Sequence, residues 1–285
     1  AIGKITIKGI NLGTAGVFII ALLYGCLLYS KLSGNLTVGE ESFSTEALKI
    51  VENMGLIFFV TSVGFIAGPN FFGNLKRNFK SYVMLGVVII AAAAALRIAC
   101  VLIGANFTSL KHEEFRAILV GILSGALTST PAFSASKAAV GAELEALVSV
   151  GYGISYLFGV VGVVLFVQIV PKVLKANMNE EVEKITAKEG AGGKKKNLIL
   201  TEVDEFGFMA FSLAAIVGIL IGSVSYMNFS LTTTGGCLLT ALVFGHYGHV
   251  GKISIVPKNS TLKMLRELGL MLFLIGAGVS GGAKF

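Results

Sequence analysis

Residues 121–136 read Gly-Ile-Leu-Ser-Gly-Ala-Leu-Thr-Ser-Thr-Pro-Ala-Phe-Ser-Ala-Ser, an apolar run that small residues, hydroxyl side chains and a proline interrupt. Pro131 has no backbone N–H and disfavours helical geometry at Thr130, so carbonyl groups near Leu127 and Thr128 lose their partners within a helix. In a membrane, such groups are tolerated only where protein or a water-filled cavity covers them. Discontinuous helices of this kind build the substrate sites of many secondary transporters. The alternative is a proline-kinked core helix whose Ser and Thr hydroxyls bond back to the helix itself.

The composition places the chain among helical membrane proteins. Hydrophobic residues make up 54% of the chain, charged residues make up 14%, and the mean hydropathy is +0.83. These values predict an all-α integral membrane protein, folded as a polytopic helical bundle. The net charge is +7, but Lys and Arg lie in short loops beside apolar spans and form no basic aromatic surface. We therefore expect anionic lipid headgroups as their partners, and no nucleic acid.

No residue pattern predicts catalysis or a bound metal. Cys26, Cys100 and Cys237 lie singly inside apolar runs without a CxxC spacing, as small hydrophobic residues do. The three histidines show no metal-ligand spacing either. Because no His, Asp and Ser constellation falls at membrane depth, we expect a protein that is not an enzyme and that has no cofactor and no metal.

Apolar segments of spanning length divide the chain into three regions. Residues 1–171 form transmembrane repeat 1, residues 172–205 form a charged cytoplasmic linker, and residues 206–285 begin transmembrane repeat 2. The predicted spans are 12–30, 48–68, 81–104, 150–171, 207–225, 233–250 and 265–284, together with the interrupted segment 117–141.

Basic residues gather in alternate loops, and this predicts the orientation of the spans. Lysines and arginines fall at residues 4–8, at 76–80, in the linker and at 252–266, whereas the loop 31–47 has an excess of acidic residues. We therefore place the basic loops on the cytoplasmic side of a membrane that the chain crosses several times.

The interrupted segment 117–141 is compatible with two membrane topologies. If Lys80 and Lys172 both lie inside, and the two spans 81–104 and 150–171 each cross once, the segment enters and leaves on the outer side. It is then a re-entrant hairpin with its tip near residues 128–131. The alternative is a single broken crossing, with one neighbouring span misassigned.

The second half of the chain repeats the residue spacing of the first half. Leu48, Lys49, Gly55, Leu56, Phe59, Gly64, Gly68 and Phe71 recur at a constant offset as Leu262, Lys263, Gly269, Leu270, Phe273, Gly278, Gly282 and Phe285. One helix earlier, Gly16, Ala21, Leu22 and Gly25 recur as Gly236, Ala241, Leu242 and Gly245. The charge pattern gives the two copies opposite orientations, and this predicts the inverted-topology repeats of secondary transporters.

The repeat also predicts that the chain is a piece of a longer protein. Repeat 2 begins with a helix at 207–225, whose counterpart in repeat 1 would precede Ala1. The counterparts of residues 81–171 would follow Phe285. We therefore expect a second broken segment, and with it the other half of the substrate site, beyond Phe285.

Several stretches resemble the aspartate:alanine exchanger family of bacterial transporters. The most specific is Gly125-Ala-Leu-Thr-Ser-Thr-Pro-Ala132, joined by the stretches 4–13, 55–69 and 150–162. The resemblance implies a duplicated antiporter for small amino acids or dicarboxylates, with the Thr and Pro signature of each half lining the substrate path. Two features depart from the family: a short linker stands where well-known members carry soluble regulatory modules, and the second signature is absent.

The predicted substrate-binding residues are Gly125, Ala126, Thr128, Ser129, Thr130, Pro131 and Arg97. The hydroxyls and carbonyls offer neutral hydrogen bonds, and a half-helix N-terminus offers roughly half a positive charge to a carboxylate. Arg97 either meets a substrate carboxylate bidentately or snorkels to the interface. Lys137 either supplies positive charge to an anion or is solvated near the outer surface, and we interpret Glu52 as a polar residue at a helix end.

These observations predict a secondary active antiporter for aspartate-like or alanine-like substrates, working by alternating access. The alternatives are an ion-coupled carboxylate symporter or exporter, and an oligomeric ion channel, which needs a filter of repeated carbonyl or charged rings. The expected partners are a small carboxylate or amino-acid substrate, membrane lipids and further copies of the chain in a homo-oligomer. The identities of the substrate and of the coupling ion stay open.

Overall fold

The computed structural model of the 285-residue chain describes residues 6–7, 10–11, 15–38, 41–78, 83–104, 106–174, 177, 203–226 and 229–283. Most of the predicted linker 172–205 lies outside the described residues. The described helices are α1 (Ala15–Asn35), α2 (Ser44–Asn78), α3 (Met84–Gly104), α4 (His112–Ala126), α5 (Thr130–Ala138), α6 (Glu145–Val173), α8 (Phe208–Ser223), α9 (Thr232–Tyr247) and α10 (Asn259–Gly282). Each predicted span overlaps one of these helices, and the interrupted segment overlaps two, α4 and α5. The all-α bundle is therefore confirmed.

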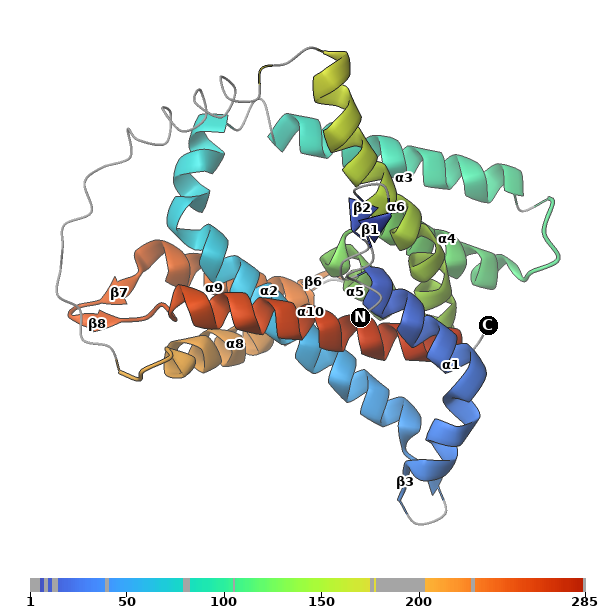
Figure 1. Cartoon of the computed structure of the whole chain (residues 1–285), viewed down its shortest axis with the longest axis horizontal. Helices are drawn as coiled ribbons and strands as arrows, with labels where there is room; N and C mark the ends of the chain where they lie inside the picture. Colours follow the sequence, from blue (N-terminus) through green and yellow to red (C-terminus); the bar gives the residue numbers. More distant parts are fainter. Residues whose placement is uncertain are drawn as a thin grey trace.

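Short antiparallel hairpins join several of the helices. They pair β1 (Thr6–Ile7) with β2 (Ile10–Asn11), β3 (Thr37–Val38) with β4 (Glu41–Ser42), β5 (Ser225–Tyr226) with β6 (Phe229–Ser230), and β7 (His249–Val250) with β8 (Ile253–Ser254). The order β1, β2, α1, β3, β4, α2 thus recurs as β5, β6, α9, β7, β8, α10 (Figure 1). The repeat read from residue spacing is also a repeat of secondary structure.

The packing of the two copies is equivalent as well. A Cβ atom built on Gly64 of α2 would lie 2.6 Å from the Cβ of Ala241 in α9. A Cβ atom built on Gly278 of α10 would lie 2.7 Å from the Cβ of Ala21 in α1. The sequence repeat matches Gly64 with Gly278 and Ala21 with Ala241, so equivalent residues make equivalent contacts. Glycine at these positions lets the helix backbones approach closely, as small residues do in membrane bundles.

Helices α2 and α10 cross near the middle of the molecule and join the two copies (Figure 1). Helix α2 also packs against α9, and α10 against α1. Helix α8 covers the far side of α9, and α4 packs against α6. The result is a central pair of long helices with one copy on either side, which leaves α5 next to the centre.

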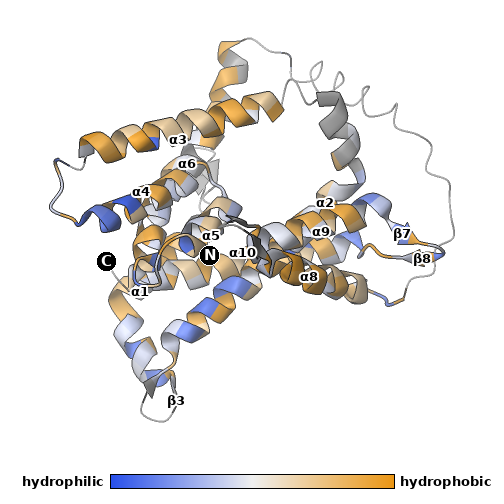
Figure 2. Cartoon of the chain, turned by 180° about the vertical axis from the view of Figure 1, so that it is seen from behind, coloured by the Kyte–Doolittle hydropathy of each residue, from blue (hydrophilic) through white to orange (hydrophobic). Residues whose placement is uncertain are grey.

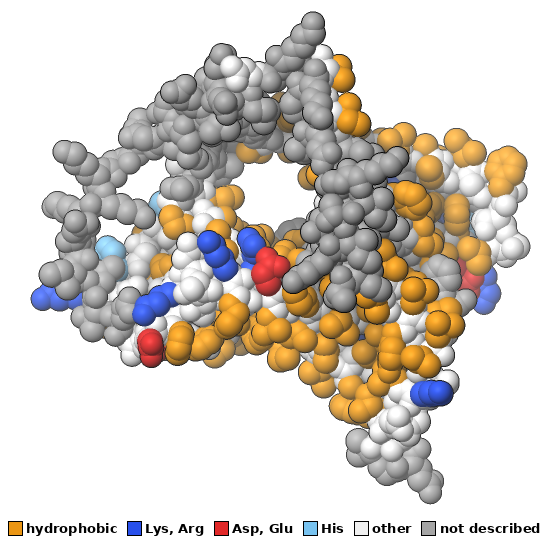
Figure 3. Space-filling model, in the orientation of Figure 1, with side chains coloured by type: hydrophobic (Ala, Val, Ile, Leu, Met, Phe, Trp, Pro, Cys, Tyr) orange, Lys and Arg blue, Asp and Glu red, His pale blue; other side chains and the backbone are white. Residues whose placement is uncertain are grey.

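The outer helices expose apolar side chains. Among the described residues, three helices are long and apolar enough to cross a membrane, at Gly16–Asn35, Ser44–Pro69 and Met84–Gly104, and Phe208–Ser223 is a shorter apolar helix. None of the residues of α3 is buried, although this helix is apolar along most of its length (Figure 2). Hydrophobic side chains also cover much of the face seen in Figure 3. Such extensive apolar exposure is typical of a surface that faces lipid.

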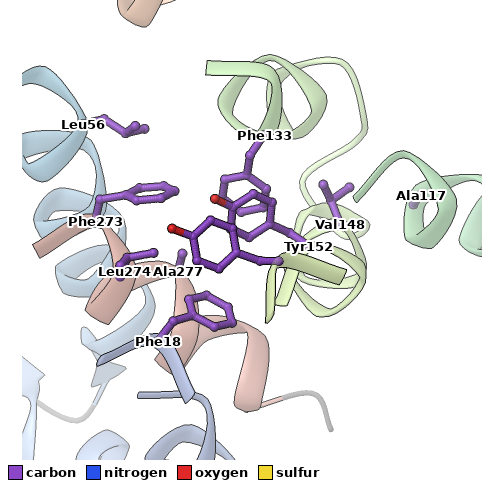
Figure 4. Close-up of a cluster of buried hydrophobic side chains, with 10 residues drawn as sticks. Phe18, Leu56, Ala117, Phe133, Val148, Tyr152, Phe273, Leu274 and Ala277 are labelled. Atoms are coloured by element: carbon purple, nitrogen blue, oxygen red, sulfur yellow. The ribbon is translucent and has the colours of Figure 1, made fainter. Parts of the chain in front are cut away.

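An aromatic core fixes α5 against its neighbours (Figure 4). The ring of Phe133 in α5 is fully buried, with its centroid 4.2 Å from that of Tyr152 in α6 and 5.6 Å from that of Phe273 in α10. Phe18 of α1 meets Tyr152 from the other side, at 6.0 Å. This short helix is therefore held between elements of both copies, and the next turn of α5 faces the candidate site.

Candidate functional site

The break between α4 and α5 is a capped helix end. Thr128 adopts a left-handed backbone with φ of 50°. Its N–H donates to the carbonyl of Gly125 at 2.9 Å, and the N–H of Ser129 donates to the carbonyl of Ser124 at 3.0 Å. This pair of bonds is a Schellman motif, which usually places glycine in the left-handed position. A threonine there is strained because of its branched Cβ, and such strain is concentrated at functional sites.

Helix α5 begins independently of α4. The Ser129 hydroxyl caps it by accepting a hydrogen bond from the N–H of Ala132 at 3.3 Å. Pro131 lies in the first turn, where a missing N–H removes no helical hydrogen bond. The segment is therefore two capped helices and not one kinked helix, and the threonine conformation contributes to the break along with the proline.

The two helices form a hairpin. Gly121 of α4 lies against Val148 of α6, and Gly125, one turn later, lies against Tyr152, so α4 and α6 run in the same direction. Helix α5 connects them and must run back, as its contacts confirm: Phe133 near its start packs on Tyr152, and Lys137 near its end lies 3.8 Å from Glu145. The tip of the hairpin is at residues 127–129. That this hairpin re-enters a membrane from the outer side stays a prediction.

Most of the predicted substrate-binding residues gather at this tip. Gly125 is buried in the contact between α4 and α6, and Thr130 is buried beside the Tyr152 hydroxyl. Thr128 and Ser129 are half-buried, while Ala126 and Pro131 are exposed. Their contact with a substrate stays a prediction.

Arg97 lies elsewhere. Its Nη2 atom donates to the carbonyl of Arg116 at 3.5 Å, in the first turns of α4. Arg116 is ten residues before Ala126, which corresponds to about 15 Å of helix. The structure therefore does not bring Arg97 to the tip of the hairpin, and a role in substrate binding stays a prediction.

A cavity of about 610 Å³ lies beside the returning limb of the hairpin, between α2, α5, α8 and α9. The hydroxyl of Ser134 in α5 lies 2.9 Å from that of Thr234 in α9, so the hairpin is in contact with the second copy at this point. None of the seven predicted substrate-binding residues is among the described residues around the cavity. It is lined by Lys49, Glu52, Asn53, Leu56, Ile57, Ser134, Lys137, Ala138, Glu145, Ile219, Gly222, Ser223, Thr232, Thr233 and Thr234.

A second strained threonine borders this cavity. Thr232 opens α9 with φ of 59°, and it is followed by Thr233 and Thr234 along the cavity wall. Thr128 and Thr232 are the two non-glycine residues with a left-handed backbone among those the structure describes. Thr128 follows the end of α4 at the tip of the hairpin, and Thr232 begins α9 at the cavity. The N-terminus of α9 also directs its partial positive charge toward this side of the bundle.

Four charged side chains form a network on the cavity wall. The Nζ of Lys137 lies 3.0 Å and 2.9 Å from the two carboxylate oxygens of Glu52 and 3.8 Å from Oε2 of Glu145. Glu145 in turn binds Lys49 at 3.1 Å. The side chains of Lys137 and Glu52 are only 12% and 5% exposed, so the first pair is buried. Charges at such depth are costly, and in membrane proteins they mark functional sites.

The same network separates two cavities. A second cavity, of about 300 Å³, lies next to the first between α1, α2, α5, α6 and α10. Lys49, Lys137 and Glu145 line both of them. The ion pairs are therefore part of a thin wall between two spaces.

Glu52 was not identified from the sequence as a residue of the candidate site. We interpreted it as a polar residue at a helix end, whereas its side chain is buried in the centre of the network. A signal was present in the sequence, because Glu52 and Lys137 are opposite charges that both fall inside predicted apolar segments. Charges at membrane depth usually pair with one another.

An inverted repeat of helices, a broken hairpin and a polar cavity with buried charges define the class of membrane transport proteins. The chain belongs to the aspartate–alanine exchanger family, described as a predicted permease membrane region, which matches residues 1–172 and 210–285.

The chain is also similar to two bacterial proteins named as uncharacterized transporters. One, from Bacteroides thetaiotaomicron, is 27% identical over 261 residues, which cover 92% of this chain and 41% of the relative. The other, from Bacteroides fragilis, is 31% identical over 185 residues, which cover 65% of this chain and 30% of the relative. The chain thus spans less than half the length of the relatives it matches. No solved structure matches it.

Proposed function

We propose that the chain forms part of a secondary antiporter that exchanges small amino acids or dicarboxylates, with the 610 Å³ cavity beside α5 as its substrate site. The observation that carries the proposal is the buried amino group of Lys137 on the wall of this cavity. The chain is a carrier in this proposal and has no enzymatic role. It lies in the inner membrane of a bacterium as a homo-oligomer.

The lining of the cavity suits a small carboxylate. The Lys137 ammonium group supplies a charged donor for one carboxylate, and such charge-assisted hydrogen bonds are the strong ones. Ser134, one turn before Lys137 in α5, and Thr234 supply neutral hydroxyls next to the positive end of the α9 dipole. The Lys137 ammonium group and several neutral dipoles would bind an anion without holding it too tightly for release.

The architecture suits alternating access. Inverted repeats let one half of a transporter rock against the other around a central site. Here the hairpin is in contact with both copies, since Lys137 pairs with Glu52 of the first copy and Phe133 packs on Phe273 of the second. The network of Lys49, Lys137 and Glu145 separates the substrate cavity from the second cavity. Movement of α5 would open and close that wall.

Counterflow in proteoliposomes tests the proposal. Vesicles loaded with unlabelled substrate should take up labelled aspartate, alanine or succinate, and empty vesicles should not. Uphill uptake into empty vesicles driven by an ion gradient would instead support a symporter, and steady single-channel currents would support a channel.

A pair of variants locates the site. Replacing Lys137 alone would leave Glu52 buried and unpaired, so Lys137→Met is combined with Glu52→Leu, which removes both charges. The double variant should insert normally and bind substrate about tenfold to a hundredfold more weakly, because a hydrogen bond to a charged group contributes about 1.5–3 kcal/mol. Lys252→Met, in the exposed turn between β7 and β8, is the matched control and should exchange substrate normally. Unchanged affinity in the double variant would move the site elsewhere.

A further inference from the structure

The carboxylate of Glu52 has one close cationic partner. Both of its oxygens contact the Nζ of Lys137, at 3.0 Å and 2.9 Å, and its side chain is 5% exposed. The wider network contributes Glu145, which lies 3.8 Å from Lys137, and Lys49, which pairs with Glu145. The charges of the two lysines and the two glutamates cancel, so this network gives the cavity no net charge.

The other elements around Glu52 supply no further charge among the described residues. Helix α10 presents Gly276, where an added Cβ would lie 2.8 Å from the Cβ of Glu52. On the cavity side, α8 and α9 contribute Ser223 and Thr234, which are neutral. The charged groups that face Glu52 are therefore Lys137 from α5, Glu145 from α6 and Lys49 from α2 itself. Any group that takes Lys137 away leaves Glu52 without its hydrogen-bonded cation, because the remaining lysine, Lys49, is paired with Glu145.

We propose that Glu52 is a proton-accepting residue of the substrate site, and that the proton is the coupling ion for substrates that lack an amino group. The inference rests on the proposed function, in which a substrate carboxylate binds Lys137. A buried carboxylate that loses its partner is strongly disfavoured in its charged form. Glu52 therefore takes one proton from the solvent through the cavity, and its carboxylate becomes a neutral carboxylic acid while the substrate carboxylate replaces it at Lys137.

An amino-acid substrate also keeps Glu52 from being left charged and unpaired, but it needs no proton to do so. Its carboxylate binds Lys137 and its ammonium group binds Glu52, so one internal ion pair is replaced by two pairs with the substrate. In both cases Glu52 is not left as an unpaired buried carboxylate, but only the dicarboxylate brings a proton with it. Glu52 thus distinguishes two kinds of substrate at one site.

Equilibrium binding of labelled succinate and alanine to the purified protein tests this inference between about pH 6.5 and pH 8.5, where the substrates keep the same charge. The dissociation constant for succinate should rise about tenfold for each pH unit, as uptake of one proton requires. The dissociation constant for alanine should change little. Succinate binding that is independent of pH would overturn the inference, as would an equal pH dependence for alanine.

The variant Glu52→Gln provides a second test, because the glutamine amide is neutral and similar in shape to the protonated glutamate side chain. Succinate binding should become independent of pH, and alanine should bind at least tenfold more weakly because no carboxylate meets its ammonium group. Glu46→Gln, in the exposed first turn of α2, is the matched control and should behave as the unaltered protein does. If Glu52→Gln does not insert, the pH dependence of the unaltered protein decides alone.

The two failures are distinguishable. Absence of counterflow with all tested carboxylates would reject the proposed function and this inference with it. Counterflow of succinate with an affinity that does not depend on pH would reject the role of Glu52 alone.

Discussion

Gly55 of α2 and Gly269 of α10 lie against each other in a reciprocal contact. A Cβ built on Gly55 would lie 2.6 Å from the carbonyl oxygen of Gly269, and a Cβ built on Gly269 would lie 2.7 Å from that of Gly55. The sequence repeat matches these two residues with each other. The pseudo-twofold axis that relates the two copies therefore passes between them, at the crossing of the central helices.

This contact predicts that adding a single methyl group at Gly55 lowers the stability of the protein substantially. Gly55→Ala should destabilise the protein by about 1–3 kcal/mol, because the added atom meets backbone that cannot move aside cheaply. The control is Gly73→Ala in the same helix, where nothing lies within 4 Å. It should be neutral or stabilising by up to about 1 kcal/mol through helix propensity. Thermal unfolding in detergent measures both, and equal midpoints would contradict the contact.

At the strained tip of the hairpin, a substitution is expected to stabilise the protein. Thr128→Gly should stabilise the protein by about 1 kcal/mol, because glycine adopts the left-handed backbone without strain. Thr233→Gly, in the regular first turn of α9, should instead be destabilising by a few tenths of a kcal/mol. Unfolding midpoints in detergent compare the two, and a destabilised Thr128→Gly would show that the threonine side chain matters more than its backbone strain.

The hydroxyls at the tip are tested separately. Thr128→Val keeps the branched Cβ and the strain but removes the hydroxyl, as Thr130→Val does for its neighbour. If these hydroxyls contact the substrate, each change should weaken binding by about 0.5–1.5 kcal/mol. Equilibrium binding of labelled substrate measures the effect. Unchanged affinity in both variants would assign the tip a structural role and leave binding to the cavity below it.

Asp204 gives the protein an acid-sensitive helix cap outside the spans. Its carboxylate accepts backbone hydrogen bonds from Met209 at 2.9 Å, from Phe208 at 2.8 Å, from Phe206 at 3.1 Å and from Gly207, at the start of α8. These bonds, that of Met209 first, hold the pKa of Asp204 below its ordinary value of 3.8.

The sign of the pH effect follows from that shift. Because the folded-state pKa is lowered, the stabilisation is present above pH 3.8 and is lost as the pH falls through the folded value. The unaltered protein should therefore unfold at a higher temperature than Asp204→Ala at neutral pH, and the difference should disappear in acid. Asp204→Asn keeps an acceptor oxygen without the charge, and its advantage over Asp204→Ala should be smaller and independent of pH. A constant difference for the unaltered protein would exclude the carboxylate as its source.

The inverted repeat predicts that its two ends lie on opposite sides of the membrane. In a cysteine-free background, Gly34→Cys near the end of α1 should react with an impermeant maleimide added to intact cells. Lys252→Cys, in the turn between β7 and β8, should react only after the membrane is opened. Both positions are exposed, so burial does not limit either reaction. Labelling of both from outside would contradict the predicted orientation.

The sequence predicted the helices and their repeat because both depend on local patterns. Apolar runs of spanning length set the helices, and glycines at a constant offset recur wherever two backbones touch, as Gly64 and Gly278 show. The two-residue hairpins escaped prediction because so short a pairing leaves no periodicity. The interrupted segment was located correctly, although the left-handed backbone of Thr128 was not expected.

The candidate site was less predictable because its parts are far apart in the chain. Lys137 and Glu52 are separated by 85 residues, and only the packing of α5 against α4, α6 and α9 brings Lys137 to Glu52 of α2. Arg97 looked comparable as a charge inside a span, yet α3 places it beside the first turns of α4. Depth in a span is visible in the sequence, but the direction in which a side chain points depends on tertiary packing.

The symmetry of the two copies also bears on the energy balance of a transporter. Two identical inverted copies would give the inward-facing and outward-facing conformations equal free energies, since each would be the other turned over. This chain departs from that equality at Glu52, whose counterpart in the second copy is Arg266. Glu52 finds its partner across the cavity in α5, whereas Arg266 pairs with the adjacent Glu267 at 2.7 Å on a half-exposed surface. In a transporter built on such copies, the resting preference between the two conformations would then be set where the copies differ in charge.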